Sequence, residues 1–173
     1  MIKKTKQFVY CTFNKEGYHR YPEAANDPSL ATGDEMDVSH LAARHMHYFY
    51  FKVWVEVNHT NRDIEFIQLR RWLESLYDAG SIELNNKSCE MISDELAEVI
   101  SIKYPGVDIR IDVAEDNING SYTEYKGGNQ TCDQYMGVDT EFIRDMRVSP
   151  GSVDIVAPGR SNPCSEIHVG TVH

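Results

Sequence analysis

Residues 44–58 read RHMHYFYFKVWVEVN, and this stretch decides the fold. Apolar and polar side chains alternate along it, which predicts a β-strand over Tyr48–Asn58. Side chains two residues apart in a strand point to the same face. His45 and His47 stand two apart at the mouth of this strand. The stretch therefore predicts a long strand that presents two imidazoles on one face.

The paired imidazoles are candidate ligands for a divalent metal, because histidine is a common metal ligand. A third histidine, His19, lies on a separate candidate strand. Three histidine ligands and one open position make a catalytic zinc site. The alternative is that all three are surface or barrel-mouth histidines that hold no metal.

The remaining strand and helix signals surround this strand in a regular order. We expect strands, helices and one long loop as follows: strands at Gln7–Phe13, Val107–Val113 and Ser121–Tyr125, helices at about Asp63–Tyr77 and Ser88–Tyr104, and a loop over Asn14–Val38. Ser88 is a candidate cap for the second helix. Pairs of strands on either side of a helix pair predict an α+β fold, with an antiparallel ββααββ sheet and two helices on one face.

Composition and charge limit the classes of partner that this chain can bind. The chain has 173 residues and a net charge of −10, which argues against binding a nucleic acid polymer but not a single nucleotide or base. No apolar run has membrane-spanning length, and no signal core follows the basic N-terminus, so we expect a cytoplasmic protein without a membrane partner. Four scattered cysteines without a Cys-x-x-Cys pair predict neither a zinc ribbon nor a disulfide framework.

The order and spacing of five short motifs resemble the family of 6-pyruvoyl-tetrahydropterin and 6-carboxytetrahydropterin synthases. The motifs are YHRYP at 18–22, RHMHYF at 44–49, DIEF at 63–66, SCE at 88–90 and VAEDN at 113–117. The resemblance implies the T-fold, a ββααββ unit that assembles into an oligomeric barrel. It also implies Zn²⁺ as cofactor, His19, His45 and His47 as its ligands, and a homo-oligomer.

The resemblance covers about Phe8 to Tyr125, so we divide the chain into a T-fold-like domain (1–125) and a C-terminal extension (126–173). The extension is rich in Gly, Asn, Ser, Pro and Asp, with one short helical pattern near Thr140–Met146. It is either an arm that reaches a neighbouring subunit or a partly disordered segment.

Two acidic residues are candidates for substrate binding. Glu115 falls where the family has a glutamate that anchors the pterin ring, and a carboxylate can accept two neighbouring N–H donors of a flat heterocycle side by side. The alternative is a solvated strand end. Glu90 opens the second expected helix, where an acid interacting with the helix dipole is the simpler interpretation.

The catalytic residues of the family are not all present. The family has a Cys shortly before its His-x-His motif, but residues 39–44 read SHLAAR, and residues 78–87 lack the family's Asp-His pair. His40 is a candidate base in this stretch, or a surface histidine. Cys89 opens a helix whose dipole would stabilise a thiolate, so it is a candidate nucleophile, or a buried packing residue.

Three functions remain open from the sequence. The first is a zinc-dependent, lyase-type enzyme acting on a reduced pterin or a purine-like small molecule, as in 7-deazaguanine (queuosine) synthesis. The second is a divergent T-fold module that binds or sequesters such a compound without turnover, which the missing catalytic residues favour. The third is a structural component of an oligomer, with the C-terminal extension as a clasp between subunits.

Overall fold

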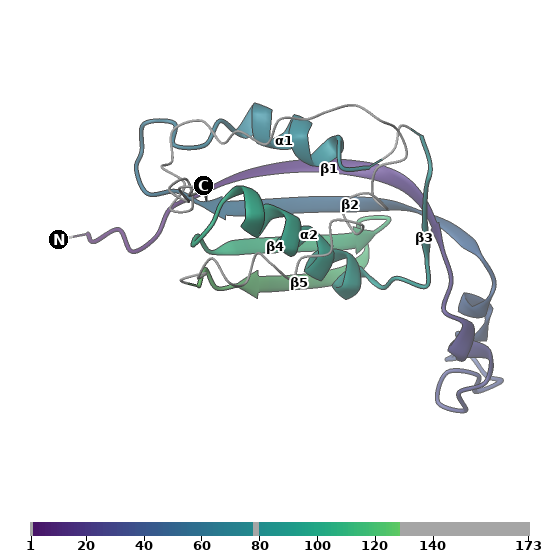
Figure 1. Ribbon diagram of the computed structural model, residues 1–173. Helices are drawn as coiled ribbons and strands as arrows, with labels where there is room; N and C mark the ends of the chain where they lie inside the picture. The colour runs from purple at the N-terminus through teal and green to yellow at the C-terminus, as the bar shows by residue number, and fades with distance from the viewer. Residues whose placement is uncertain (1, 78–79, 129–173) are drawn as a thin grey trace, which may run out of the picture.

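The computed structural model describes residues 2–77 and 80–128. Its elements in chain order are β1 (Phe8–His19), the 3-10 helices η1 (Pro22–Ala25) and η2 (Ser39–Ala42), β2 (His45–Glu56), α1 (Phe66–Glu74), β3 (Ile82–Asn85), α2 (Cys89–Lys103), β4 (Ile109–Glu115) and β5 (Asn119–Tyr125) (Figure 1). The α+β class expected from the sequence is confirmed. The expected helix at Thr140–Met146 lies outside the described residues.

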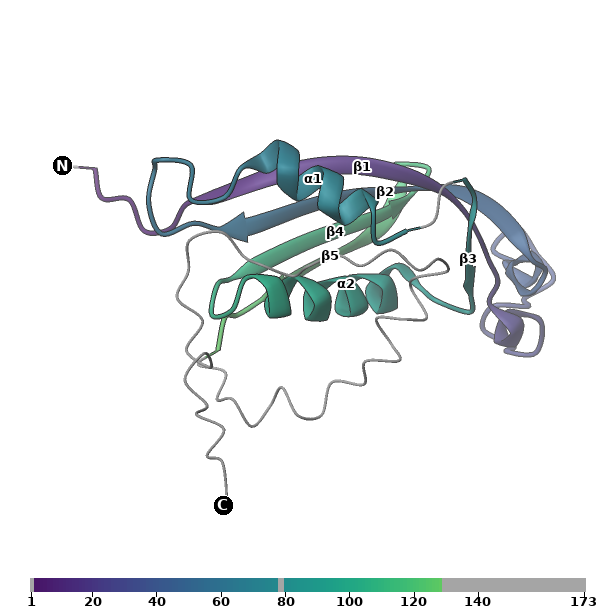
Figure 2. The ribbon, with the colours of Figure 1, turned by 45° about the horizontal axis from the view of Figure 1, so that its top comes forward.

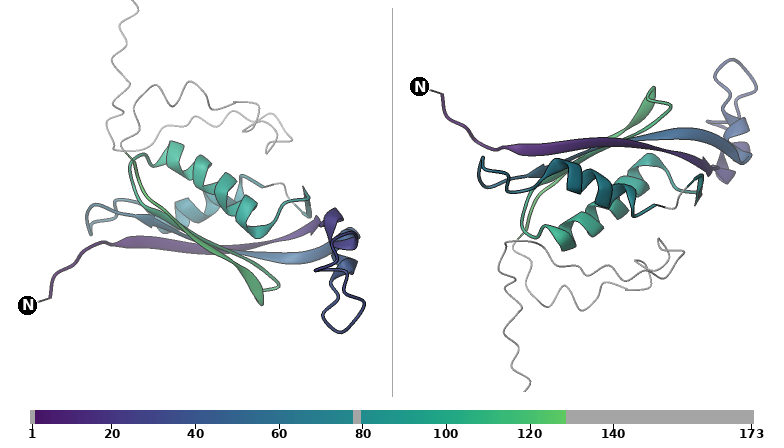
Figure 3. Two further views of the ribbon diagram at one scale, coloured as in Figure 1. Left: turned by 90° about the horizontal axis from the view of Figure 1, so that it is seen from below. Right: turned by 90° about the horizontal axis from the view of Figure 1, so that it is seen from above.

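The five strands form one mixed sheet in the order β3-β1-β2-β4-β5. The pairs β1–β2, β2–β4 and β4–β5 are antiparallel, and β3 pairs with β1 in parallel. Both helices cover the same face of the sheet, with α1 against β1 and α2 against β4 and β5 (Figure 3). None of the helices within the described ranges has the length and apolar character needed to cross a bilayer.

Two sequence expectations were wrong in this region. β1 continues to His19, so the loop begins six residues later than the predicted start at Asn14. The polar residues of this extension look like a loop in the sequence. Pairing with β2 stabilises the strand along its whole length, from Phe8 opposite Glu56 to His19 opposite His45. The connection between the helices contains β3, so the order is ββαβαββ and the sheet is not purely antiparallel.

The core lies between the sheet and the two helices. On β2, Phe49, Phe51, Val53 and Val55 are at most 1% exposed and alternate with exposed or half-buried residues, as the sequence predicted. Their partners from the helices are also buried: Leu69 and Leu73 of α1, and Ile92, Leu96 and Ile100 of α2. Complete burial of side chains of this size contributes about 1.5–3 kcal/mol each. This core fixes the strands whose ends carry the histidines.

Local signals set where the helices begin. Ser88 caps α2, as predicted, because its hydroxyl accepts a hydrogen bond from the Met91 amide at 3.3 Å. α1 begins at Phe66, later than expected. The Asp63 carboxylate instead accepts a hydrogen bond from the Asn58 amide at 2.8 Å, which closes the turn after β2.

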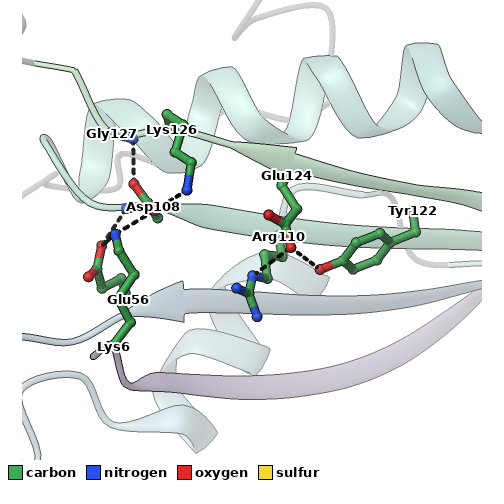
Figure 4. Close-up of polar contacts among 8 residues, drawn as sticks. All are labelled: Lys6, Glu56, Asp108, Arg110, Tyr122, Glu124, Lys126 and Gly127. Atoms are coloured by element: carbon green, nitrogen blue, oxygen red, sulfur yellow. Dashed lines mark hydrogen bonds and ion pairs between the residues drawn. The ribbon is translucent and has the colours of Figure 1, made fainter. Parts of the chain in front are cut away.

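Two ends of the sheet have different chemistry. At the end where β4 begins, Asp108 is only 8% exposed and accepts hydrogen bonds from Lys6 (2.5 Å), Lys126 (3.1 Å) and the Gly127 amide (2.9 Å) (Figure 4). These contacts join the segment before β1 to the segment after β5. At the opposite end, β1 ends, β2 begins and β4 ends, with η1 and η2 lying beyond the sheet (Figure 2). That end carries the histidines.

Candidate metal centre

Strand register brings the three histidines together. His19 is the last residue of β1 and lies directly opposite His45, the first residue of β2. His47 is two residues further along β2, so it shares the face of His45. The ring centroids are 4.6 Å apart for His19 and His45, 5.0 Å for His45 and His47, and 5.3 Å for His19 and His47.

The three imidazoles present one unpaired nitrogen each to a common point. One ligand atom from each ring lies within 4.8 Å of the other two, a cluster that could hold a metal ion. The Nε2 atoms of His19, His45 and His47 are all buried and have no hydrogen-bond partner. A buried polar atom without a partner costs about 1–3 kcal/mol. Three such atoms side by side are explained if a cation bridges them.

The other ring nitrogen of each histidine is held by a hydrogen-bond acceptor. His19 Nδ1 lies 3.1 Å from the Lys87 carbonyl oxygen, and His45 Nδ1 lies 2.7 Å from the Ala43 carbonyl oxygen. Because a carbonyl only accepts, each Nδ1 must carry the proton, which leaves a lone pair on Nε2. Such second partners commonly fix the tautomer and orientation of metal-binding histidines.

His47 has the same arrangement with a carboxylate, since its Nδ1 lies 2.6 Å from Asp116 Oδ2. The Tyr48 amide donates to Asp116 Oδ1 at 2.9 Å. The hydrogen bond from His47 holds the pKa of Asp116 below its usual value. Asp116 and Asn117 have positive φ in the tight turn between β4 and β5, a conformation that Asp and Asn tolerate.

Phe49 forms the floor of the histidine cluster. It is fully buried, and its ring makes edge contacts with His19 (5.1 Å between centroids) and His47 (6.1 Å). Gly17, opposite His47 on β1, leaves room for it: a Cβ there would come within 2.9 Å of the Phe49 ring. The glycine therefore allows a large ring to support the imidazoles from below.

Glu115 stands beside the histidines at the end of β4. It lies opposite Phe49 in the β2–β4 register, so its side chain points to the same face as the cluster. Its Oε1 is 3.4 Å from His19 Nε2, and its Oε2 is 3.6 Å from His47 Nε2. These separations are within ion-pair range, yet neither Nε2 has a hydrogen-bond partner. The carboxylate is therefore a neighbour of the cluster but not a hydrogen-bond acceptor for it.

A cavity of about 500 Å³ opens next to the cluster. Its walls come from the strand ends, the first turn of α2 and the loops around them: His19, His45, Glu115, Asn119, Gly120, Ser88, Cys89, Glu90, Met91, Tyr21, Leu41 and Asn86. The volume lies within the range of small-molecule sites. The cavity thus places the histidine cluster and an acidic side chain within reach of one small ligand.

The other sequence candidates occupy different positions. Cys89 and Glu90 line the cavity, whereas His40 is exposed on η2 and is not part of the wall. Cys89 is buried, with its Sγ 3.9 Å from Glu115 Oε1. Burial, and then the nearby Glu115 carboxylate, raise the pKa of the Cys89 thiol to about 12. This rise in pKa opposes the thiolate that a nucleophilic Cys89 would need.

Sequence reasoning missed the groups that orient the imidazoles. Nothing in a sequence marks the carbonyls of Ala43 and Lys87 as partners, because their position depends on the folded backbone. Asp116 did give a signal, since an acidic residue directly follows Glu115 in a turn, but its contact with His47 spans 69 residues.

No protein-family model matches this chain, and a search of curated proteins finds no match. The resemblance to the pterin synthase family therefore stays a prediction from the sequence motifs.

Proposed function

We propose that this protein is a zinc-dependent enzyme of the lyase type, acting on a reduced pterin or a purine-like small molecule. The observation that carries the proposal is the convergence of three buried, unpaired Nε2 atoms beside a cavity of ligand size. The protonated Nδ1 atoms direct all three lone pairs inward. This donor set supports a catalytic metal site over a set of surface histidines.

Zinc suits this donor set best. Three neutral imidazoles are borderline ligands that bind zinc tetrahedrally, whereas calcium and magnesium prefer oxygen ligands. When bound, zinc supplies a Lewis acid that can polarise a carbonyl or hydroxyl oxygen of the substrate. His19, His45 and His47 would hold it, and Asp116 would orient His47.

The acidic wall of the cavity supports the substrate class that the family resemblance implies. The Glu115 carboxylate faces a space large enough for a bicyclic ring and is 28% exposed there. Pterins and guanine-like bases present adjacent N–H donors on one edge, which a carboxylate accepts in a bidentate pairing. Glu90, at the first turn of α2, is the second acid in the same wall.

The same proposal includes assembly into a homo-oligomeric barrel. Among the described residues β5 lies at the edge of the sheet, and an unpaired edge is a template for pairing with another chain. A ring of such sheets is the T-fold assembly that the motifs imply. Its presence would be read from the mass of the protein in solution.

Metal analysis of the purified chain tests the metal site. We expect close to one zinc per chain, lost in His45→Ala and kept in His59→Ala, which removes an exposed imidazole from the turn after β2. A zinc-free native protein that also fails to bind added zinc would refute the enzyme proposal.

A binding module without turnover is the second candidate, and a specific observation favours it. Among the residues that the structure describes, Cys89 is the one cysteine in the cavity wall, and burial raises the pKa of its thiol to about 12, while His40 lies outside the wall. Incubation with dihydroneopterin triphosphate separates the two candidates. Product formation that disappears in His45→Ala supports the enzyme, whereas tight binding without product supports the module.

A further inference from the structure

We propose that Glu115 is the fourth ligand of the metal in the resting protein, and that a bound heterocycle displaces it. This inference rests on the proposed function, because it describes how the same metal site opens for its substrate. It assigns Glu115 two alternating partners, the metal and the ring, in place of the ring alone.

The first argument is distance. Tetrahedral zinc with bonds of about 2.1 Å places neighbouring donor atoms about 3.4 Å apart. Glu115 Oε1 is 3.4 Å from His19 Nε2, and Glu115 Oε2 is 3.6 Å from His47 Nε2. The carboxylate therefore already stands at ligand-to-ligand separation from two of the three imidazoles.

The second argument is the chemistry of the facing atoms. Because the Nδ1 atoms of His19 and His47 carry the protons, their Nε2 atoms are acceptors. The Glu115 oxygens are acceptors as well. Acceptors that face each other at this separation repel unless a cation lies between them. A metal ion between the imidazoles and Glu115 would turn this repulsion into shared coordination.

The third argument is that the fold fixes Glu115 there. It is the last residue of β4, and the β2–β4 pairing holds it opposite Phe49. The next residue, Asp116, accepts hydrogen bonds from His47 and from the Tyr48 amide. The backbone on both sides of Glu115 is thus tied to the strand that carries two of the histidines. The strand pairing therefore keeps its carboxylate beside the histidine cluster.

Displacement follows from competition for the same two oxygens. Glu115 also lines the cavity, where a ring edge with adjacent N–H donors would pair with both oxygens. A carboxylate engaged in that pairing leaves the metal with three imidazoles and one open position. The site would thus be closed without substrate and open with it.

Zinc affinity of Glu115→Gln tests the coordination, with Glu90→Gln as the matched control. Both variants remove one negative charge from the same cavity, but Glu90 stands on α2 and is hydrogen-bonded to Ser88. We expect Glu115→Gln to weaken zinc binding by more than about 100-fold, beyond the loss typical of a residue that only supports a ligand. Equal affinities of the two variants would overturn the proposal.

Cobalt substitution provides a readout independent of activity. The visible spectrum of Co²⁺ at a closed site should not change on addition of azide, whereas Glu115→Gln should respond to it. Addition of pterin should make the native cobalt protein respond as well. A native spectrum that shifts with azide alone would refute closure by Glu115.

A failure of the Glu115 proposal can be told apart from a failure of the zinc-site proposal. If the native protein binds zinc through His45 but responds to azide without pterin, the zinc site stands and only the assignment of Glu115 as a ligand is refuted. A native cobalt protein closed to azide both with and without pterin keeps Glu115 as a ligand but refutes its displacement by the ring.

Discussion

Asp116→Asn is the sharpest test of how the proposed metal site is oriented. The native carboxylate accepts hydrogen bonds from two donors, His47 Nδ1 at 2.6 Å and the Tyr48 amide at 2.9 Å. An Asn side chain has one acceptor oxygen, so it can satisfy only one of them, and its NH₂ group then faces the other donor. If the amide faces His47, the imidazole must move or place its proton on Nε2, which removes the lone pair that binds metal. Asn tolerates positive φ, so the turn itself is retained.

The expected loss of zinc affinity follows from the position of Asp116, which is hydrogen-bonded to the proposed ligand His47. Loss of such a partner typically lowers metal affinity by about 10–100-fold, or about 1.4–2.8 kcal/mol. Competition with a chromophoric chelator at pH 7 measures the zinc affinity directly. Thermal unfolding in excess zinc should show the same loss of stabilisation, whereas unfolding in chelator should change little.

Asp112→Asn is the control, because it removes an equal charge from β4 opposite Lys52 and Tyr122. Its zinc affinity should stay near that of the native chain. If Asp116→Asn binds zinc as tightly as Asp112→Asn, then Asp116 does not orient His47 and the account of the site fails at that point.

Two further predictions concern the frame around the site. In chelator at pH 7, Asp108→Asn should be less stable than the native chain by about 2 kcal/mol, a modest value because both lysine partners are largely exposed. The contacts from Lys6, Gly127 and Lys126 hold the folded-state pKa of Asp108 far below its unfolded value of about 3.9. Its contribution is therefore complete above that value and is lost as the pH falls toward the folded pKa, so urea unfolding should show the difference shrinking below about pH 4. Gly17→Ala should lower the free energy of unfolding by about 1–3 kcal/mol and weaken zinc binding, because its Cβ would displace the Phe49 ring beneath His19 and His47. Gly128→Ala has open space around its Cβ and should do neither. Equal melting temperatures for the two glycine variants would contradict the role of Phe49 as the floor of the cluster.

The strongly periodic parts of the fold were predictable from sequence. β2 was recognisable because one face is fully buried and the other is not, and α2 because Ser88 caps it and its apolar residues recur at helical spacing. The second half of β1 was not, because Asn14, Lys15 and Glu16 look like a loop when read alone. They are a strand because residues more than thirty positions away pair with them. β3 is four residues long and depends wholly on pairing with β1.

The candidate site was predictable where a local spacing encoded it. His45 and His47 share a face through the two-residue period of a strand, and this needed no knowledge of the fold. The placement of His19 and Glu115 needed the register of β1 and β4 on either side of β2, which the motif order suggested but could not fix. The orienting carbonyls of Ala43 and Lys87 were beyond reach, because backbone carbonyls carry no signal in the sequence.

The position of the histidines relative to the core explains how one chain can keep an electrostatically costly site. The apolar residues that stabilise the fold occupy β2 from Phe49 onward, under α1 and α2, while the unpaired Nε2 atoms lie at the strand ends beyond them. Metal-free imidazoles and the facing Glu115 carboxylate therefore destabilise the rim of the sheet rather than its centre. Phe49 is the contact between the two regions, buried in the core and touching His19 and His47 by its edge. The core thus holds the three imidazoles in place, which is the preorganisation that the proposed binding site for a metal and a flat ring requires.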